Sequence, residues 1–78
     1  MKYHVVFRDL SGVWEKDLTE PRSLTCREAA RAALEQTGRD PSRELRSVIY
    51  MKDGERVEPD SFLSDGSSLS VYVLLGGG

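Results

Sequence analysis

One segment in the middle of the chain has the pattern of an amphipathic helix. Thr25 opens it and Glu28 follows three residues later, which is the capping-box spacing. Its apolar stripe recurs at helical spacing through Cys26, Ala29, Ala30, Ala33 and Leu34. Gly38 supplies a left-handed stop, and we expect Pro41 to prevent the helix from restarting. The sequence thus predicts one helix over residues 25–37, and a single helix can cover only one face of a small sheet.

Alternating and β-branched segments on both sides of this helix predict strands. They cover residues 3–8, 13–18, 46–51 and 68–75, with a short additional strand at 56–57. Residues 9–12 and the Asp53-Gly54 dipeptide have the composition of tight turns. Residues 60–63 have the length of a single helical turn.

The order of these elements is a hairpin, a helix and then two or three strands. The first and last strands are both apolar and alternating, so we expect them to be central neighbours. A right-handed crossover through the helix makes that pair parallel. The predicted class is α+β with a β-grasp fold, in which a mixed sheet of four or five strands packs on one helix. We place the domain at residues 1–75 and a flexible tail at residues 76–78.

Length and composition exclude several classes of protein. A chain of 78 residues has room for one core. Its net charge of −2 is dispersed, which argues against nucleic-acid binding. No apolar run approaches the ~18 residues of a membrane span, and the N-terminus does not read as a signal peptide. The single cysteine, Cys26, excludes an internal disulfide and fits a reducing compartment. We expect a cytoplasmic monomer.

The sequence ends on an apolar pair followed by three glycines, Leu74-Leu75-Gly76-Gly77-Gly78. Glycine has no Cβ and loses the most conformational freedom on ordering, so such a run adds nothing to a fold. It suits a terminus that is threaded through a narrow channel of another protein. The alternative is a loose end, because disorder concentrates at termini.

Together these features resemble the ubiquitin-like family over essentially the whole chain. The residues that carry the resemblance are 3–8, the turn at Gly12, 13–18, the capped helix, 48–51 and 68–78. The last stretch aligns without gaps with the end of ubiquitin. The Asp53-Gly54 turn, the Leu63-Ser64-Asp65-Gly66 step and the final glycines also resemble the sulfur carriers of molybdopterin and thiamine synthesis.

The resemblance implies that the tail is activated by other proteins. An E1-like adenylating enzyme would use ATP to activate the Gly78 carboxylate, or that of Gly77 after trimming by a peptidase. In a modifier, the acyl group then passes through thioesters, with an E2-like enzyme, to target proteins, and a JAB or deubiquitinase-type peptidase is a further expected partner. In a sulfur carrier the same carboxylate becomes a thiocarboxylate. In both cases the chain itself is not an enzyme and binds no cofactor.

The tail departs from the ubiquitin pattern in one respect. Ubiquitin alternates leucine with arginine before its glycines, whereas this chain has Tyr72, Leu74 and Gly76 and no arginine after Arg56. Activating enzymes that read those arginines should not recognise it, which implies a dedicated partner enzyme.

Side chains on the face of the sheet away from the helix form a candidate partner-binding patch. An exposed apolar cluster of this kind is typical of an interaction surface. The predicted members are His4, Val6, Ile49, Met51, Tyr72 and Leu74. By resemblance, Ile49 lies where ubiquitin has the central isoleucine of its recognition patch. The alternative is that loops or a partner chain cover this face.

The remaining candidates have simpler interpretations. Cys26 lies at the first turn of the helix, where the dipole lowers a thiol pKa, but it also begins the apolar stripe. His4 has no neighbouring cysteine or second histidine with which to bind a metal. Trp14 is interpreted as a core or rim aromatic. No acid–base pair or nucleophilic group indicates catalysis, so the third hypothesis is a binding module of β-grasp shape with incidental glycines.

Overall fold

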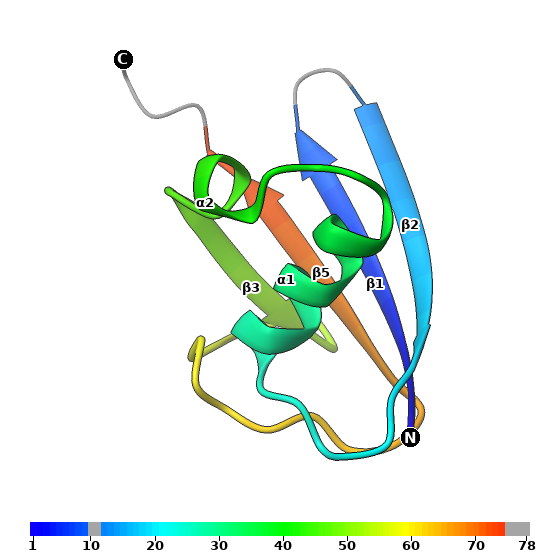
Figure 1. Cartoon of the computed structure of the whole chain (residues 1–78). Helices are drawn as coiled ribbons and strands as arrows, with labels where there is room; N and C mark the ends of the chain where they lie inside the picture. The colour runs from blue at the N-terminus through cyan, green and yellow to red at the C-terminus, as the bar shows by residue number, and fades with distance from the viewer. Residues whose placement is uncertain (10–11, 75–78) are drawn as a thin grey trace.

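Across residues 1–9 and 12–74, which this computed structural model describes, five strands form one sheet and the main helix packs on one of its faces (Figure 1). The elements in chain order are β1 (Lys2–Asp9), β2 (Gly12–Thr19), α1 (Cys26–Gln36), α2 (Pro41–Glu44), β3 (Val48–Lys52), β4 (Glu55–Val57) and β5 (Ser67–Val73). None of the described helices is long and apolar enough to cross a membrane. The predicted tail, Gly76, Gly77 and Gly78, lies outside the described residues.

The sheet is mixed, with the strand order β2-β1-β5-β3-β4. The central pair, β1 and β5, is parallel and runs from Tyr3 opposite Ser67 to Arg8 opposite Tyr72. The other three pairings are antiparallel. This confirms the predicted α+β class and its β-grasp-like topology, including the parallel central pair.

The core lies between α1 and the inner face of the sheet. Alternation along the strands turns Val5, Leu69 and Val71 inward, each fully buried. The helix contributes three alanines and Leu34 to the same core, and small side chains let the helix approach the sheet closely. Burying one large apolar side chain contributes about 1.5–3 kcal/mol, so this layer supplies most of the driving force for folding.

The first turn of α1 begins at the predicted capping box. The Glu28 N–H donates to Thr25 Oγ1 at 3.1 Å, and the Thr25 N–H donates to the Glu28 carboxylate at 3.0 Å. Arg22 also donates to that carboxylate, and together with the Thr25 N–H it lowers the pKa of Glu28 to about 2. The local signal in the sequence therefore located the helix start correctly.

The segment before β5 is not the single helical turn predicted for residues 60–63. A turn at residues 58–61, in which the Ser61 N–H donates to the Glu58 carbonyl at 3.1 Å, leads the chain past the start of α1. There the carbonyls of Pro59 and Ser61 accept hydrogen bonds from the N–H groups of Arg27 and Cys26, each at 2.9 Å. The first N–H groups of a helix have no partner within it. This distant segment supplies the missing partners, and its turn lies at residues 58–61, two residues before the predicted position.

The C-terminal end of α1 also follows its local signal. Gly38 has φ +75°, and the N–H groups of Gly38 and Arg39 donate to the carbonyls of Glu35 and Leu34, the two bonds of a Schellman motif. Pro41, in contrast, does not prevent a new helix. It takes the first position of α2, where a missing N–H costs nothing, and Asp40 caps that helix by accepting from the Ser42 N–H at 3.0 Å.

Strands β3 and β4 meet at the expected tight turn. Asp53 and Gly54 both have positive φ, 53° and 80°, as a two-residue type I′ hairpin loop requires. On the other side of β3, β5 ends at Val73, and the Leu74 N–H still donates to the Ser47 carbonyl at 2.9 Å. The chain is therefore held against the sheet up to residue 74.

Candidate functional site

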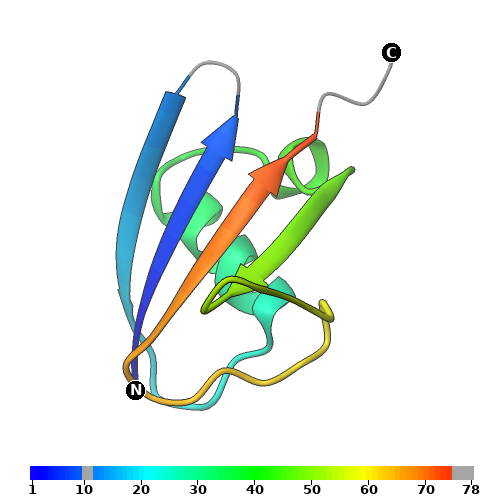
Figure 2. The same cartoon turned by 180° about the vertical axis from the view of Figure 1, so that it is seen from behind.

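The face of the sheet that points away from α1, here called the outer face, is covered by neither described helix (Figure 2). The predicted partner-binding patch falls on this face. Strand alternation places its members there because their chain neighbours turn into the core. The pairing registers then decide which of these side chains are neighbours.

Ile49 and Tyr72 are directly opposite each other on β3 and β5. Tyr72 is 40% exposed, and Leu74, two residues further along the same strand direction, is 45% exposed. These three residues form an apolar group at the end of the sheet where β5 ends. Contact with a partner at this group would involve Leu74, the last residue that the structure describes.

Val6 and Met51 are not direct neighbours. Both pair with Ser70, which lies between them on β5. The hydroxyl-bearing side chain thus interrupts the apolar row in the middle of the outer face. The predicted patch is therefore divided into a group around Tyr72 and a second row that consists of Val6, Ser70 and Met51.

Arg8 is a member of this surface that sequence reasoning missed. It is the β1 residue opposite Tyr72, and its guanidinium carbon lies 5.8 Å from the centre of the tyrosine ring. At this distance a cation is attracted by the face of an aromatic ring. The exposed group around Tyr72 is therefore both apolar and cationic.

His4 lies apart from the group around Tyr72. It is opposite Ser68 on β5 and Asp17 on β2, toward the other end of the sheet. Its Nδ1 is 2.6 Å from Asp17 Oδ1, and its Nε2 is 2.9 Å from Glu15 Oε1. Hydrogen bonding to Asp17 is the main cause that raises the pKa of His4 above 6.5, against a smaller opposing effect of burial. The structure does not bring His4 to Tyr72.

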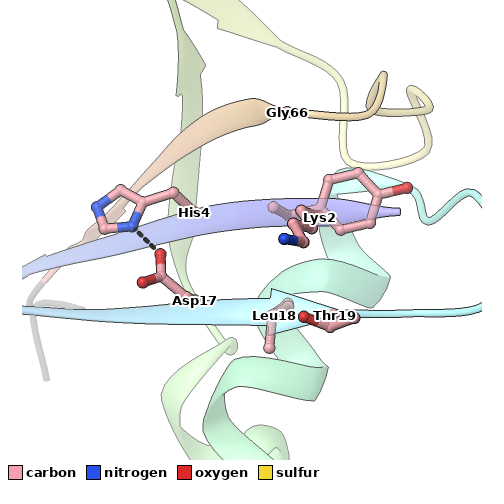
Figure 3. Close-up of a pocket in the computed structure, with 7 residues that line it drawn as sticks. Lys2, His4, Asp17, Leu18, Thr19 and Gly66 are labelled. Carbon is pink, nitrogen blue, oxygen red and sulfur yellow. Dashed lines mark hydrogen bonds and ion pairs between the residues drawn. The ribbon is translucent and has the colours of Figure 1, made fainter.

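A shallow hollow of about 320 Å³ lies beside this histidine, between the start of β1 and the end of β2. Figure 3 shows His4 and Asp17 meeting across the two strands, with Gly66 on the other side of β1. The contact with Asp17 occupies one imidazole nitrogen and the contact with Glu15 occupies the other. Among residues 1–9 and 12–74, no cluster of three or more His, Cys, Asp or Glu side chains could hold a metal ion.

Cys26 is part of the core, and Trp14 is the aromatic at the edge of the core that the sequence predicts. Cys26 is 1% exposed, and burial raises the pKa of its thiol, which disfavours the reactive thiolate. Trp14 stacks on Phe7 with ring centres 4.4 Å apart, and Arg39 lies 4.4 Å over its outer side. It is a rim aromatic that closes one edge of the core.

Comparison with known proteins identifies no family. A scan against models of protein families finds no match, and a search of the curated proteins finds none either.

Proposed function

We propose that this protein is a ubiquitin-like modifier that is conjugated to target proteins through its C-terminal glycine. A carboxylate is a poor electrophile, so an E1-like enzyme first joins the Gly78 carboxylate to AMP with release of pyrophosphate from ATP. A cysteine thiol then displaces AMP to form a thioester, and an amine of the target displaces the thiol. If a peptidase removes one residue, Gly77 supplies the same carboxylate. The protein is the group that is carried, and its partners supply the catalysis.

The observation that carries this proposal is the β-grasp-like topology, with β5 as a central strand that leads toward the glycines. The Leu74 N–H bonds to the Ser47 carbonyl, so the sheet holds the chain up to the residue before Leu75-Gly76-Gly77-Gly78. A rigid domain joined to an unhindered glycine sequence suits an enzyme that holds the domain and acts on the tail.

The outer face gives a second reason. Tyr72 and Leu74 are exposed, and the half-buried Ile49 lies opposite Tyr72, so apolar surface stands at the end of β5, shortly before the glycines in the sequence. Exposed apolar patches of this kind mark protein–protein contacts. An activating enzyme that binds this group would have the tail within reach.

A sulfur carrier is the second candidate, because the same topology and glycines would serve it equally. The positive-φ turn at Asp53-Gly54 and the Leu63-Ser64-Asp65-Gly66 step are the features that resemble this branch. In that case a donor of sulfide would attack the adenylated carboxyl carbon and displace AMP, which leaves with one of the original carboxyl oxygens, so that sulfur takes its place.

The test is to add the purified protein to a lysate of its source cells with and without ATP and to follow its mass. A modifier gives ATP-dependent adducts of higher mass, and peptide mapping locates the new bond at Gly78 or Gly77. A sulfur carrier gives only the mass change of sulfur for oxygen at that carboxyl.

The matched control is the same protein shortened by Gly77 and Gly78, with its fold verified by circular dichroism. Loss of every covalent product in the shortened protein is the expected result. If the full-length protein stays unmodified with ATP, or if the shortened protein is modified as well, then both candidates are wrong and a non-conjugated binding module is left.

A further inference from the structure

A hollow of about 490 Å³ lies against the edge of β3 that faces away from β5. It is bounded by α1, by residues 45–47 before β3, by the β4 region up to Pro59, and by Leu74. β4 pairs only with Tyr50–Lys52, so in the described part of the chain the first half of β3 has no strand beside it on this edge. An unpaired strand edge of this kind can accept an extended chain.

Three arginines from separate elements line this hollow, and no carboxylate does. Arg27 comes from α1, Arg46 from the segment before β3, and Arg56 from β4. One nitrogen of Arg27 is paired with Asp60 at 2.9 Å. Within residues 1–9 and 12–74, Arg46 and Arg56 form no ion pair within 4.0 Å. The edge of β3 is therefore a cationic surface on a chain whose net charge is −2.

This cationic surface extends along the sheet. A second hollow of about 240 Å³ shares Arg46, Ser47 and Leu74 with the first and adds Arg43 and Glu44. The two hollows adjoin at these shared residues, and their combined lining holds four arginines and one acidic side chain, Glu44. Apolar residues line the same hollow as the arginines, among them Leu45, Ile49 and Leu74. An occupant of complementary chemistry carries both acidic and apolar side chains.

A phosphate group fits this surface less well than an acidic peptide does. Phosphate sites in proteins commonly use free backbone N–H groups at a helix start. Here the first N–H groups of α1 are already bonded to the carbonyls of Ser61 and Pro59 and to Thr25 Oγ1. The arginines come from three elements spread around an open hollow, and the planar guanidinium pairs well with carboxylates.

We propose that the depression along the free edge of β3, lined by Arg27, Arg46 and Arg56, binds an extended acidic segment of a partner protein. Carboxylates of the segment pair with the arginines, and its apolar side chains contact Leu45 and Ile49. This binding surface does not depend on the chemistry proposed for Gly78, because every residue that forms it belongs to the folded domain.

The test uses a short synthetic peptide of alternating glutamate and valine, titrated into the ¹⁵N-labelled full-length protein. We expect the amide shift changes to concentrate at Ser47, Val48 and Ile49, and the affinity to fall as salt is raised from about 50 to about 500 mM, because exposed charge pairs are screened. Replacing Arg46 and Arg56 by glutamine should weaken binding about tenfold or more, which corresponds to about 1.4 kcal/mol.

The matched control replaces Arg31 and Arg39 by glutamine, which changes the net charge equally at arginines outside the hollow. This variant should bind the peptide as the parent protein does. Equal losses in both double variants, shift changes centred elsewhere, or equal binding of a lysine–valine peptide would each overturn the proposal. So would inorganic phosphate or ATP that shifts the same amides while the glutamate peptide shifts none. The conjugation assay would be unaffected by any of these outcomes.

Discussion

At the scale of single residues, the environment of His4 makes its charge depend on pH. Neutral imidazole has one N–H and can donate to one carboxylate, whereas the imidazolium donates from both nitrogens. Asp17 and Glu15 face the two nitrogens, so the folded protein favours the charged form. Because the folded-state pKa of His4 is raised, the contact stabilises the fold fully below about pH 6.5. The contribution is lost as pH rises through the raised pKa.

We therefore expect His4→Gln to lower the free energy of unfolding at pH 5.5 and to have little effect at pH 9. The measurement is urea denaturation across this range, followed by the fluorescence of the single tryptophan, Trp14. Asp17→Asn removes the main cause of the raised pKa of His4. Its loss in the free energy of unfolding should therefore also be larger at pH 5.5 than at pH 9. If the difference in the free energy of unfolding between the parent protein and His4→Gln stays the same from pH 5.5 to pH 9, the contact adds no pH-dependent stability.

The neighbours of these residues could be predicted from the sequence only in part. Alternation in β1 and β5 correctly assigned His4, Val6 and Tyr72 to one face. It could not tell that Arg8, rather than His4, lies opposite Tyr72, because the register of a parallel pair is set by the packing of the whole core. The contacts of His4 with Glu15 and Asp17 depend in the same way on the register of the β1–β2 hairpin.

At the scale of elements, the signals that worked were local. The capping box at Thr25 and the left-handed Gly38 each act within a few residues, so the two ends of α1 could be located from the sequence. The interpretation of residues 60–63 was wrong because the carbonyls of Pro59 and Ser61 bond to the start of α1, more than thirty positions earlier in the chain. The prediction that Pro41 prevents a new helix was wrong for a different reason, because proline is found both after helix ends and at the first position of helices.

The N-terminal cap of α1 gives a direct test of one such local signal. Thr25→Ala removes the oxygen that accepts from the Glu28 N–H, and we expect a loss of about 1 kcal/mol in the free energy of unfolding. Thr25→Ser keeps a hydroxyl at the same place and should lose much less. Urea denaturation at pH 7 measures both. Equal losses in the two variants would assign the effect to the methyl group rather than to the cap.

At the scale of the whole molecule, β5 holds the two halves of the sheet together. It lies between β1 and β3, and Leu69 on it is fully buried. A domain of this size has a free energy of unfolding of about 4–12 kcal/mol.

The β3 edge proposed to bind an acidic segment is formed only by the fold of the whole chain. Its arginines lie far apart in the sequence and show no spacing from which their proximity could be predicted.

Replacing Leu69 should therefore remove a large part of the stability. We expect Leu69→Ala to cost about 2–5 kcal/mol, from lost transfer energy and from the cavity that is left. Val13→Ala is the matched control, because this side chain is 57% exposed on the edge strand β2, and it should cost about 0.5 kcal/mol or less. Thermal and urea denaturation report both values. Similar costs for the two variants would contradict a core centred on β5.

The parallel pairing of β1 and β5 also determines how the domain bears mechanical load. The start of β1 lies at one end of the sheet and the end of β5 lies at the other (Figures 1 and 2). A force that pulls these two ends apart acts along both strands, across the hydrogen bonds between them. The hydrogen bonds between β1 and β5, along the pairing that runs from Tyr3 and Ser67 to Arg8 and Tyr72, then carry the load together in shear and do not open one after another. A motor that pulls on one end of the domain while the other is held must break this whole row before the sheet yields.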